Sequence, residues 1–339
     1  TALAALESAR HALAFGSGMG AIVTVGNLLS AGDYVLSSDS IYGCSHRYFT
    51  QCLRPQGYDV QFADFTDLAA VADKLRPNTR LVWVEALSNP RMKLVDLKAL
   101  CELRDRLAPK AIIGVDNTFM SPLCFRPLDF GADLSLHSVT KYINGHSDVT
   151  MGAIMTNRED LYTKLSGLQN TVGTVSSPFD CFLANRGLKT LSLRMAVHQS
   201  NGLSVARFLE SHPMITQVLH PGLESHPQYE LAHRQCRGFS GMILFRLKGT
   251  AAEAKAFLLS LKYVRNACSL GGVVSNIWAL RDLPDNALKA LGVDEQMFRL
   301  SVGIEDVEDL IQDLATALEC ARLSLDAWIL FLSCDGFKQ

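Results

Sequence analysis

The stretch ADLSLHSVTKYINGHSD, residues Ala132–Asp148, is the most informative part of the sequence. Its first half alternates apolar and polar residues, which is typical of a short β-strand, and a polar loop containing Lys141 follows. Ser138 and Thr140 stand two residues apart, so their hydroxyls point to the same side of an extended chain. We therefore expect two hydroxyls and one amine to emerge together where a strand ends, although a lysine at that point is also a common surface residue.

The chemistry of these groups suits pyridoxal phosphate. In an open parallel sheet, ligands bind beyond the carboxyl ends of the strands. Hydroxyl groups at that edge can hold a phosphate, and a lysine amine can form an imine with an aldehyde. Since pyridoxal phosphate carries both groups, Lys141 is the candidate cofactor lysine.

Composition favours a globular protein with two domains. The chain has 339 residues, of which 48% are hydrophobic and 19% are charged. No apolar run approaches the roughly 18 to 20 residues of a membrane helix, so we expect no membrane partner. Lys and Arg number 32 against 34 Asp and Glu, and this balance does not favour a nucleic-acid partner.

The nine cysteines are scattered along the chain and are never spaced as C-x-x-C. This argues against a disulfide framework and a structural zinc site, so we expect no metal and a reducing, cytoplasmic location. Thr1 lies within a helical pattern and no leader is recognisable, from which we expect the natural protein to begin further upstream.

In the first half of the chain, predicted strands alternate with predicted helices, which is typical of a parallel α/β sheet. Helices are expected around 67–75 and 96–107. The predicted strands are His11–Phe15, Tyr34–Ser37, Tyr58–Ala63, Leu81–Glu85, Ile112–Val115 and Leu134–His137.

The second half has a different pattern. A long helical region over 178–209 leads into it, and a final helix is expected near 307–323. Strands are predicted at 215–219, 242–247 and 299–302. We place the domain boundary between 1–192, the cofactor domain, and 193–339, a C-terminal domain that completes the substrate site.

A glycine-rich turn, Gly16–Ala21, follows the first predicted strand. Its backbone can approach a phosphate closely, and the first amides of the next helix are unpaired donors. The turn also matches the dinucleotide fingerprint G-x-G-x-x-G/A, with Asp39 near the position of a ribose-binding acid. A nicotinamide dehydrogenase is therefore an alternative, although the weak preceding strand does not suit it, and an ordinary turn is a third interpretation.

Polar residues follow other predicted strands, namely Tyr42, Asn89 and Asp116. A carboxylate at the end of a buried strand is costly unless a positive group meets it, and a protonated pyridine nitrogen would serve. Asp116 is therefore the candidate partner of the cofactor ring, although it could also be a turn or helix-capping residue. In the second half, Arg299 could bind a substrate carboxylate or lie on the surface.

Several motifs together resemble the trans-sulfuration, or Cys/Met metabolism, family of pyridoxal-phosphate enzymes. The resemblance is greatest to its eukaryotic carbon–sulfur lyases and covers about 1–272 and 291–318. The motifs are SLHSVTKYINGHSDV, VDNTFMSP, SGMGAI, the turn Ser88-Asn89-Pro90, YGCSHRYF, NRGLKTLSLRM, HPGLESHPQYELAHRQ and RLSVGIEDVEDLI.

The resemblance implies fold-type I, with a mostly parallel seven-stranded sheet flanked by helices and a smaller α/β C-terminal domain. It also implies a homotetramer whose active sites are shared across a dimer. The implied activity is cleavage of the sulfur amino acid cystathionine to cysteine, 2-oxobutyrate and ammonia, with hydrogen sulfide from cysteine or homocysteine as a side activity.

Residue roles follow from the same resemblance. Lys141 would be the Schiff-base lysine and general base, and Tyr42 would stack on the ring and assist proton transfer. Asn89 would bind the ring hydroxyl, and Asp116 the pyridine nitrogen. The groups that would hold the phosphate are the amides of Gly18 and Met19 and the hydroxyls of Ser138 and Thr140. The substrate would be bound by Arg47, Ser269 and Arg299.

The sequence also departs from the family. A Tyr and an Arg that a neighbouring subunit usually contributes come from an N-terminal region that this chain lacks. Cys268 stands where the lyases usually have a glutamate, and the segment after Gly272 is shorter and different. A γ-synthase, a methionine-cleaving lyase and an inactive or regulatory relative therefore remain as alternatives.

Overall fold

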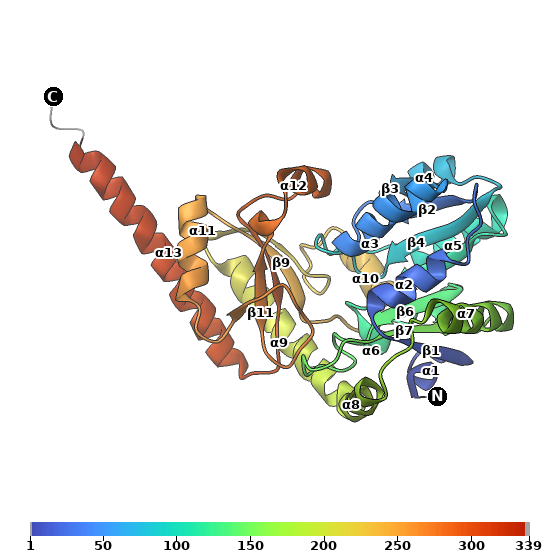
Figure 1. Cartoon of the computed structure of the whole chain (residues 1–339). Helices are drawn as coiled ribbons and strands as arrows, with labels where there is room; N and C mark the ends of the chain where they lie inside the picture. Colours follow the sequence, from blue (N-terminus) through green and yellow to red (C-terminus); the bar gives the residue numbers. More distant parts are fainter. Residues whose placement is uncertain (1, 336–339) are drawn as a thin grey trace. The chain divides into compact units, whose positions relative to one another are not determined.

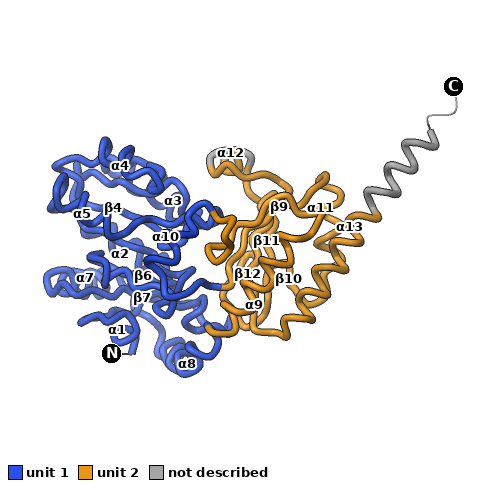
Figure 2. Tube along the Cα trace, turned by 180° about the vertical axis from the view of Figure 1, so that it is seen from behind, with its two compact units in different colours: residues 1–195, 227–240 blue, residues 196–226, 241–339 orange. Residues whose placement is uncertain are grey.

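The chain folds into two compact units in the computed structural model, which describes residues 2–335 apart from the side chains of 285, 286, 290 and 324–335. Unit 1 consists of residues 1–195 and 227–240, and unit 2 consists of residues 196–226 and 241–339 (Figure 2). The segment 227–240 therefore belongs to the unit that contains the first half of the chain.

Unit 1 is built on a seven-stranded sheet with the order β1-β7-β6-β5-β4-β2-β3 (Figure 1). The five strands from β6 to β3 in this order are mutually parallel, while β7 runs antiparallel to both β6 and β1. The strands are β1 (His11–Phe15), β2 (Tyr34–Ser38), β3 (Asp59–Ala63), β4 (Thr79–Glu85), β5 (Ile112–Asp116), β6 (Leu134–Ser138) and β7 (Gly152–Thr156).

The central strands are buried along nearly their whole length, because helices cover both faces of a parallel sheet. Trp83 of β4 is fully buried, and its ring occupies the space beside Gly114 of β5. A Cβ at position 114 would lie 2.8 Å from that ring, so the indole requires glycine there. The centre of the sheet is therefore tightly specified.

The helices of unit 1 begin where the sequence supplies capping residues. Ser17 caps α2, Asp67 caps α4 and Asp96 caps α5, each by accepting a backbone N–H. The helices are α1 (Ala2–Leu6), α2 (Gly18–Gly26), α3 (Gly43–Arg47), α4 (Leu68–Lys74), α5 (Leu97–Leu107), α6 (Ser121–Cys124), α7 (Glu159–Val172), α8 (Pro178–Leu188) and α10 (Tyr229–Gln235).

Unit 2 contains a five-stranded sheet with the order β10-β11-β12-β9-β8. Its strands are β8 (Ile215–Leu219), β9 (Met242–Leu247), β10 (Arg265–Asn266), β11 (Asn276–Ala279) and β12 (Met297–Ser301). Its helices are α11 (Ala251–Ser260), α12 (Asp285–Leu291), α13 (Val307–Asp335) and most of α9 (Leu191–Ser211). Three aromatic rings, Phe245, Phe257 and Phe298, are fully buried and contact one another in its core.

The predicted fold class is confirmed, since unit 1 has a mostly parallel seven-stranded sheet and unit 2 is a smaller α/β unit. All six strands predicted in the first half are present. The long helical region predicted over 178–209 is present and consists of two helices, α8 and α9. Arg299 lies in the middle of its strand rather than at the start, because pairing with β9 extends β12 back to Met297.

The described part of the chain contains neither a candidate membrane-spanning helix nor a candidate metal-binding cluster. No helix within residues 2–335 is both long and apolar enough to cross a membrane. Among the residues whose side chains the structure describes, there is no group of three or more His, Cys, Asp or Glu arranged to hold a metal ion.

The aromatic core of unit 2 yields a stability prediction. Phe298→Ala should reduce the free energy of unfolding by about 3–5 kcal/mol, because it leaves a cavity between Phe245 and Phe257. Leu259→Ala is the control, since Leu259 is 76% exposed and its loss should change stability by no more than about 0.5 kcal/mol. Urea unfolding measures both, and equal losses in the two variants would contradict the assigned core.

Candidate active site

The carboxyl ends of β4, β5 and β6 lie side by side in the sheet, and each ends in a polar residue. Glu85 pairs with Asp116, and Asp116 pairs with Leu136, two residues before Ser138. The turn after β6 then carries Lys141. The structure therefore brings residues that are far apart in sequence to one edge of the sheet, where an open parallel sheet binds its ligands.

Asp116 is a buried carboxyl group at this edge. Desolvation by burial raises its pKa above the usual range, and hydrogen bonds from Thr118 and the proximity of His137 offset part of that rise. The backbone N–H of Thr118 donates to Asp116 Oδ1 at 3.0 Å. A carboxylate in this position is stabilised by a cation, as expected for the partner of a pyridinium nitrogen.

Thr118 also links this carboxylate to β6, a role that the sequence did not indicate. Its hydroxyl oxygen accepts the backbone N–H of Ser138 at 2.8 Å. The ends of β5 and β6 are therefore joined through one threonine, which holds Asp116 and Ser138 at a fixed separation.

The start of α2 lies against Ser138. Ser17 is the N-cap residue of this helix, and its Oγ accepts the Gly20 N–H at 2.9 Å. A Cβ at Gly18 would stand 3.1 Å from the Ser138 Cβ, which is tighter than most such contacts. Glycine lets this backbone approach Ser138 closely, since any larger residue would require the serine to shift by a few tenths of an ångström. Met19 is the next residue of the same turn. An anion at this helix start would meet N–H donors and a hydroxyl.

Thr140 and Lys141 lie in the turn that follows β6. The Thr140 hydroxyl accepts the Met151 N–H at 3.0 Å, and the Lys141 N–H donates to Ser138 O at 3.1 Å. The turn is further fixed by Arg194, whose guanidinium donates to the Tyr142 and Ile143 carbonyls at 2.6 and 3.0 Å. The half-buried Lys141 therefore projects from a rigid turn rather than from a flexible loop.

Tyr42 and Asn89 are joined through Glu85. The Tyr42 N–H donates to Glu85 Oε1 at 2.6 Å, and the Asn89 N–H donates to Glu85 Oε2 at 2.9 Å. Asn89 is buried and precedes a cis proline, whereas the Tyr42 side chain is 44% exposed. The two predicted cofactor residues are therefore brought together by a third residue that the sequence did not single out.

A buried polar network connects Glu7, in the turn after α1, to strand β6. Glu7 is fully buried, and its Oε1 lies 2.5 Å from His137 Nε2. The same oxygen accepts the Ser135 hydroxyl at 2.9 Å and the Asn117 side-chain amide at 3.1 Å. Successive side chains of a strand point to opposite faces of the sheet, so Ser135 and His137 share one face and Ser138 lies on the other. The network therefore lies on the face opposite to Ser138.

The predicted substrate residues have separate locations. Arg47 is the last residue of α3 in unit 1 and is exposed, whereas Ser269 and Arg299 belong to unit 2. Arg299 is only 3% exposed, and its Nη2 donates to the Cys268 carbonyl at 2.6 Å. Its guanidinium also lies 4.9 Å from the ring centroid of Trp278, the residue opposite it on β11.

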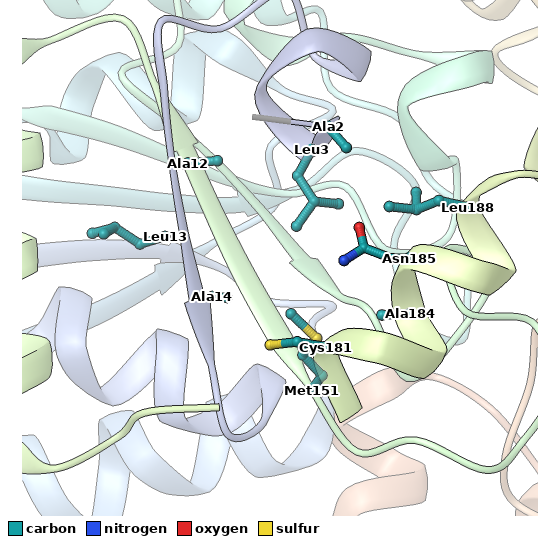
Figure 3. A pocket seen from close by; sticks show the side chains of 10 residues that line it. All are labelled: Ala2, Leu3, Ala12, Leu13, Ala14, Met151, Cys181, Ala184, Asn185 and Leu188. Carbon is teal, nitrogen blue, oxygen red and sulfur yellow. The ribbon is translucent and has the colours of Figure 1, made fainter. Parts of the chain in front are cut away.

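A cavity of about 220 Å³ in unit 1 contains none of these residues (Figure 3). Its apolar lining includes Leu3, Leu13 and Leu188. Asn185 and Cys181 of α8 also line it, as does Met151. This mainly apolar space therefore does not mark the candidate active site.

The residues of unit 1 fit pyridoxal phosphate. Gly18 and Ser138 offer a close backbone and a hydroxyl for a phosphate, and the buried Asp116 carboxyl offers a partner for the ring nitrogen. Lys141 supplies an amine on the turn that follows Ser138. Each functional group of the cofactor thus has a chemically suitable residue at this edge.

Comparison with known proteins defines the class of the molecule. The family model described as Cys/Met metabolism PLP-dependent enzyme matches residues 1–319. The chain belongs to this family, and its cofactor is pyridoxal phosphate. The predicted family and cofactor are therefore confirmed.

Individual relatives are more specific. The chain is 45% identical to a cystathionine γ-lyase of Dictyostelium discoideum, with 94% of this chain and 83% of the relative aligned. It is 46% identical to human cystathionine γ-lyase over 95% of this chain and 80% of the relative. A cystathionine γ-synthase of Xanthomonas oryzae pv. oryzae, solved in complex with cystathionine, is 42% identical with a TM-score of 0.92 over 95% of this chain and 84% of that one.

The dehydrogenase alternative is wrong, and the sheet shows why. The dinucleotide fingerprint requires a strand, the glycine turn and a helix that lead to a parallel neighbouring strand. Here β1 pairs antiparallel with β7 at the edge of the sheet, and α2 leads to β2 on its far side. The glycines of Gly16–Ala21 therefore do not open a dinucleotide-binding unit.

The raised pKa of Asp116 predicts how stability depends on pH in the cofactor-free protein. The folded state binds this proton more tightly than the unfolded chain, so the ionised carboxylate disfavours folding above the folded-state pKa. This penalty disappears as the pH falls towards the ordinary value of 3.8. Asp116→Asn should therefore be at least as stable as wild type at neutral pH, and its advantage should shrink in acid. Thermal unfolding across pH tests this, and a less stable variant at neutral pH would contradict it.

Proposed function

We propose that this protein is a carbon–sulfur lyase that cleaves cystathionine with water to cysteine, 2-oxobutyrate and ammonia. The observation that carries the proposal is the sheet edge on which Asp116, Ser138 and Lys141 stand together. The identity of 45–46% to proteins named cystathionine γ-lyase supports the choice of substrate. Hydrogen sulfide release from cysteine or homocysteine would be a side activity of the same site.

The cofactor would be held by residues of unit 1. We assign the phosphate to the amides of Gly18 and Met19 and the hydroxyls of Ser138 and Thr140. Asp116 would pair with the ring nitrogen, Asn89 with the ring hydroxyl, and Tyr42 would stack on the ring. When bound, pyridoxal phosphate supplies an electron sink for the charge that develops at the substrate α-carbon.

The protein's own groups then move protons. Lys141 Nζ would take the proton from the substrate α-carbon as general base. Once the amine has released this proton to the bound cofactor, the same group, assisted by the Tyr42 hydroxyl, would take the β-proton, whose loss allows the γ-sulfur to depart. A half-buried lysine on a turn fixed by Arg194 suits this task, because the amine must reach two neighbouring carbons without moving the backbone.

Recognition of the substrate is assigned to Arg299, Ser269 and Arg47. The Arg299 guanidinium is suited to a carboxylate because it can donate two parallel hydrogen bonds. Its contacts with the Cys268 carbonyl and the Trp278 ring restrict its rotamers. Arg47, on the exposed end of α3, would border the remainder of the substrate.

Assembly and location complete the proposal. We propose a homotetramer in which active sites are shared across a dimer, as the family resemblance implies. We also propose a cytoplasmic location, which is supported by the free state of the cysteines in the described part of the chain. We keep as a proposal a cofactor domain over 1–192 and a C-terminal domain over 193–339. Unit 1 differs from the first of these domains because it ends at residue 195 and also includes residues 227–240.

Other activities of the same family are the second candidates. A γ-synthase is favoured by the 42% identity to the solved Xanthomonas enzyme. Altered substrate choice, such as methionine cleavage, or a loss of activity is favoured by Cys268 and the segment after Gly272, which differ from the usual lyase sequence.

Cofactor labelling tests the proposed site. Incubation with pyridoxal phosphate should produce a visible absorption band, and borohydride reduction should attach the cofactor to the peptide that contains Lys141. Lys141→Ala should abolish this labelling and lower turnover by about 100-fold or more, because it removes both the attachment point and the base. Its circular dichroism should match wild type. Labelling of another peptide would refute the assignment.

Product analysis tests the substrate. With cystathionine, the protein should release 2-oxobutyrate faster than with methionine, and coupled reduction of the keto acid measures both rates. Release of 2-oxobutyrate from methionine alone would favour a methionine-cleaving lyase. Condensation of cysteine with an activated homoserine, without cleavage, would favour the synthase, and labelling at Lys141 without either reaction would indicate an inactive relative.

A further inference from the structure

Glu85 is a buried carboxylate to which the mechanism has assigned no role. It is the last residue of β4 and is only 5% exposed. Its two oxygens accept different backbone N–H groups, with Tyr42 N at 2.6 Å from Oε1 and Asn89 N at 2.9 Å from Oε2. One side chain therefore holds the backbones of both residues.

These two backbones come from separate parts of the sheet edge. Tyr42 lies between β2 and α3, whereas Asn89 lies in the turn after β4. Glu85 also pairs in register with Asp116 on the neighbouring strand. Three residues assigned to the cofactor ring are therefore neighbours of Glu85. Tyr42 and Asn89 are hydrogen-bonded to its carboxylate, and Asp116 is its partner on the adjacent strand.

Hydrogen bonds to a buried carboxylate are strong, and leaving one unmade is costly. The carboxylate suits this position because it can accept from two donors at once, one on each oxygen. A glutamine of the same shape has only one acceptor oxygen, and its NH₂ group would face a backbone N–H that needs an acceptor. Glu85→Gln should therefore release one of the two loops without creating a cavity.

We propose that Glu85 is a positioning residue that fixes Tyr42 and Asn89 relative to each other and thereby orients the cofactor ring. It acts through their backbones and need not touch the ring. This role rests on the proposed function, in which Tyr42 and Asn89 contact the cofactor. The competing interpretation is that Glu85 only satisfies two buried N–H groups and affects stability alone.

A matched control is available in unit 2. Glu253 is 4% exposed, and its Oε2 accepts the Thr250 N–H at 2.5 Å at the start of α11. Glu253→Gln also weakens a bond between a buried carboxylate and a backbone N–H, but in a part of the chain with no proposed cofactor residue. Glu85→Gln should lose thermal stability. Glu253→Gln should lose less, because a glutamine still offers the single acceptor oxygen that the Thr250 N–H needs.

The experiment compares the two variants with wild type by the dissociation constant for pyridoxal phosphate, the circular dichroism of the bound cofactor's visible band, and borohydride labelling. Glu85→Gln should weaken cofactor binding by about tenfold or more and reduce the circular dichroism signal, while labelling stays at Lys141. Glu253→Gln should leave the cofactor readouts unchanged. The proposal is overturned if Glu85→Gln changes only thermal stability, as the control does.

Two further outcomes are distinguishable. If Glu85→Gln does not fold, Glu85→Asp takes its place, since a side chain shorter by one methylene keeps the charge but should not reach both amides. Wild-type affinity and circular dichroism in Glu85→Asp would then refute the positioning role. Absence of labelling at Lys141 in wild type would remove the proposed function itself, and with it this role of Glu85.

Discussion

The register of β4, β5 and β6 is the constraint on which the candidate site depends. Because Glu85 pairs with Asp116 and Asp116 with Leu136, three strand ends reach the same edge of the sheet. A shift of one residue in any strand would turn its polar end residue to the other face. Trp83 against Gly114 makes such a shift costly, since no other residue leaves space for the indole. Packing in the core of the sheet therefore sets the relative positions of the polar residues at the ends of β4, β5 and β6.

Much of this arrangement could be predicted from the sequence because it is local. The continuous apolar runs of β4 and β5, bounded by polar turns, identified buried parallel strands, and Lys141 was recognised from the residues just before it. β7 (Gly152–Thr156) was missed because five residues of mixed size follow a long turn without a clear period. The short strands β10 and β11 are defined by pairing across long stretches of chain, which periodicity does not reveal.

The supporting residues could not be predicted for the same reason. Glu85 was visible only as the end of a strand, because its contact with Tyr42 spans 43 positions of sequence. Glu7 and His137 are 130 positions apart, and each alone is an ordinary turn or strand residue. The residues that we propose to carry the chemistry could be predicted from the sequence, whereas the residues that contact and position them are recognisable only in the fold. Both groups of residues are needed. Asp116 alone would not orient the cofactor ring if Tyr42 were free to move.

In the proposed site, Lys141 and the buried Asp116 carboxylate bind opposite ends of the same cofactor ring. A crystal structure of the protein with pyridoxal phosphate bound measures this directly. We expect the cofactor to be attached to Lys141 Nζ and an Asp116 oxygen to lie about 2.7–2.9 Å from the ring nitrogen, as in a charge-assisted hydrogen bond. Attachment to another residue, or an Asp116 carboxylate separated from the ring nitrogen by intervening side chains, would contradict it.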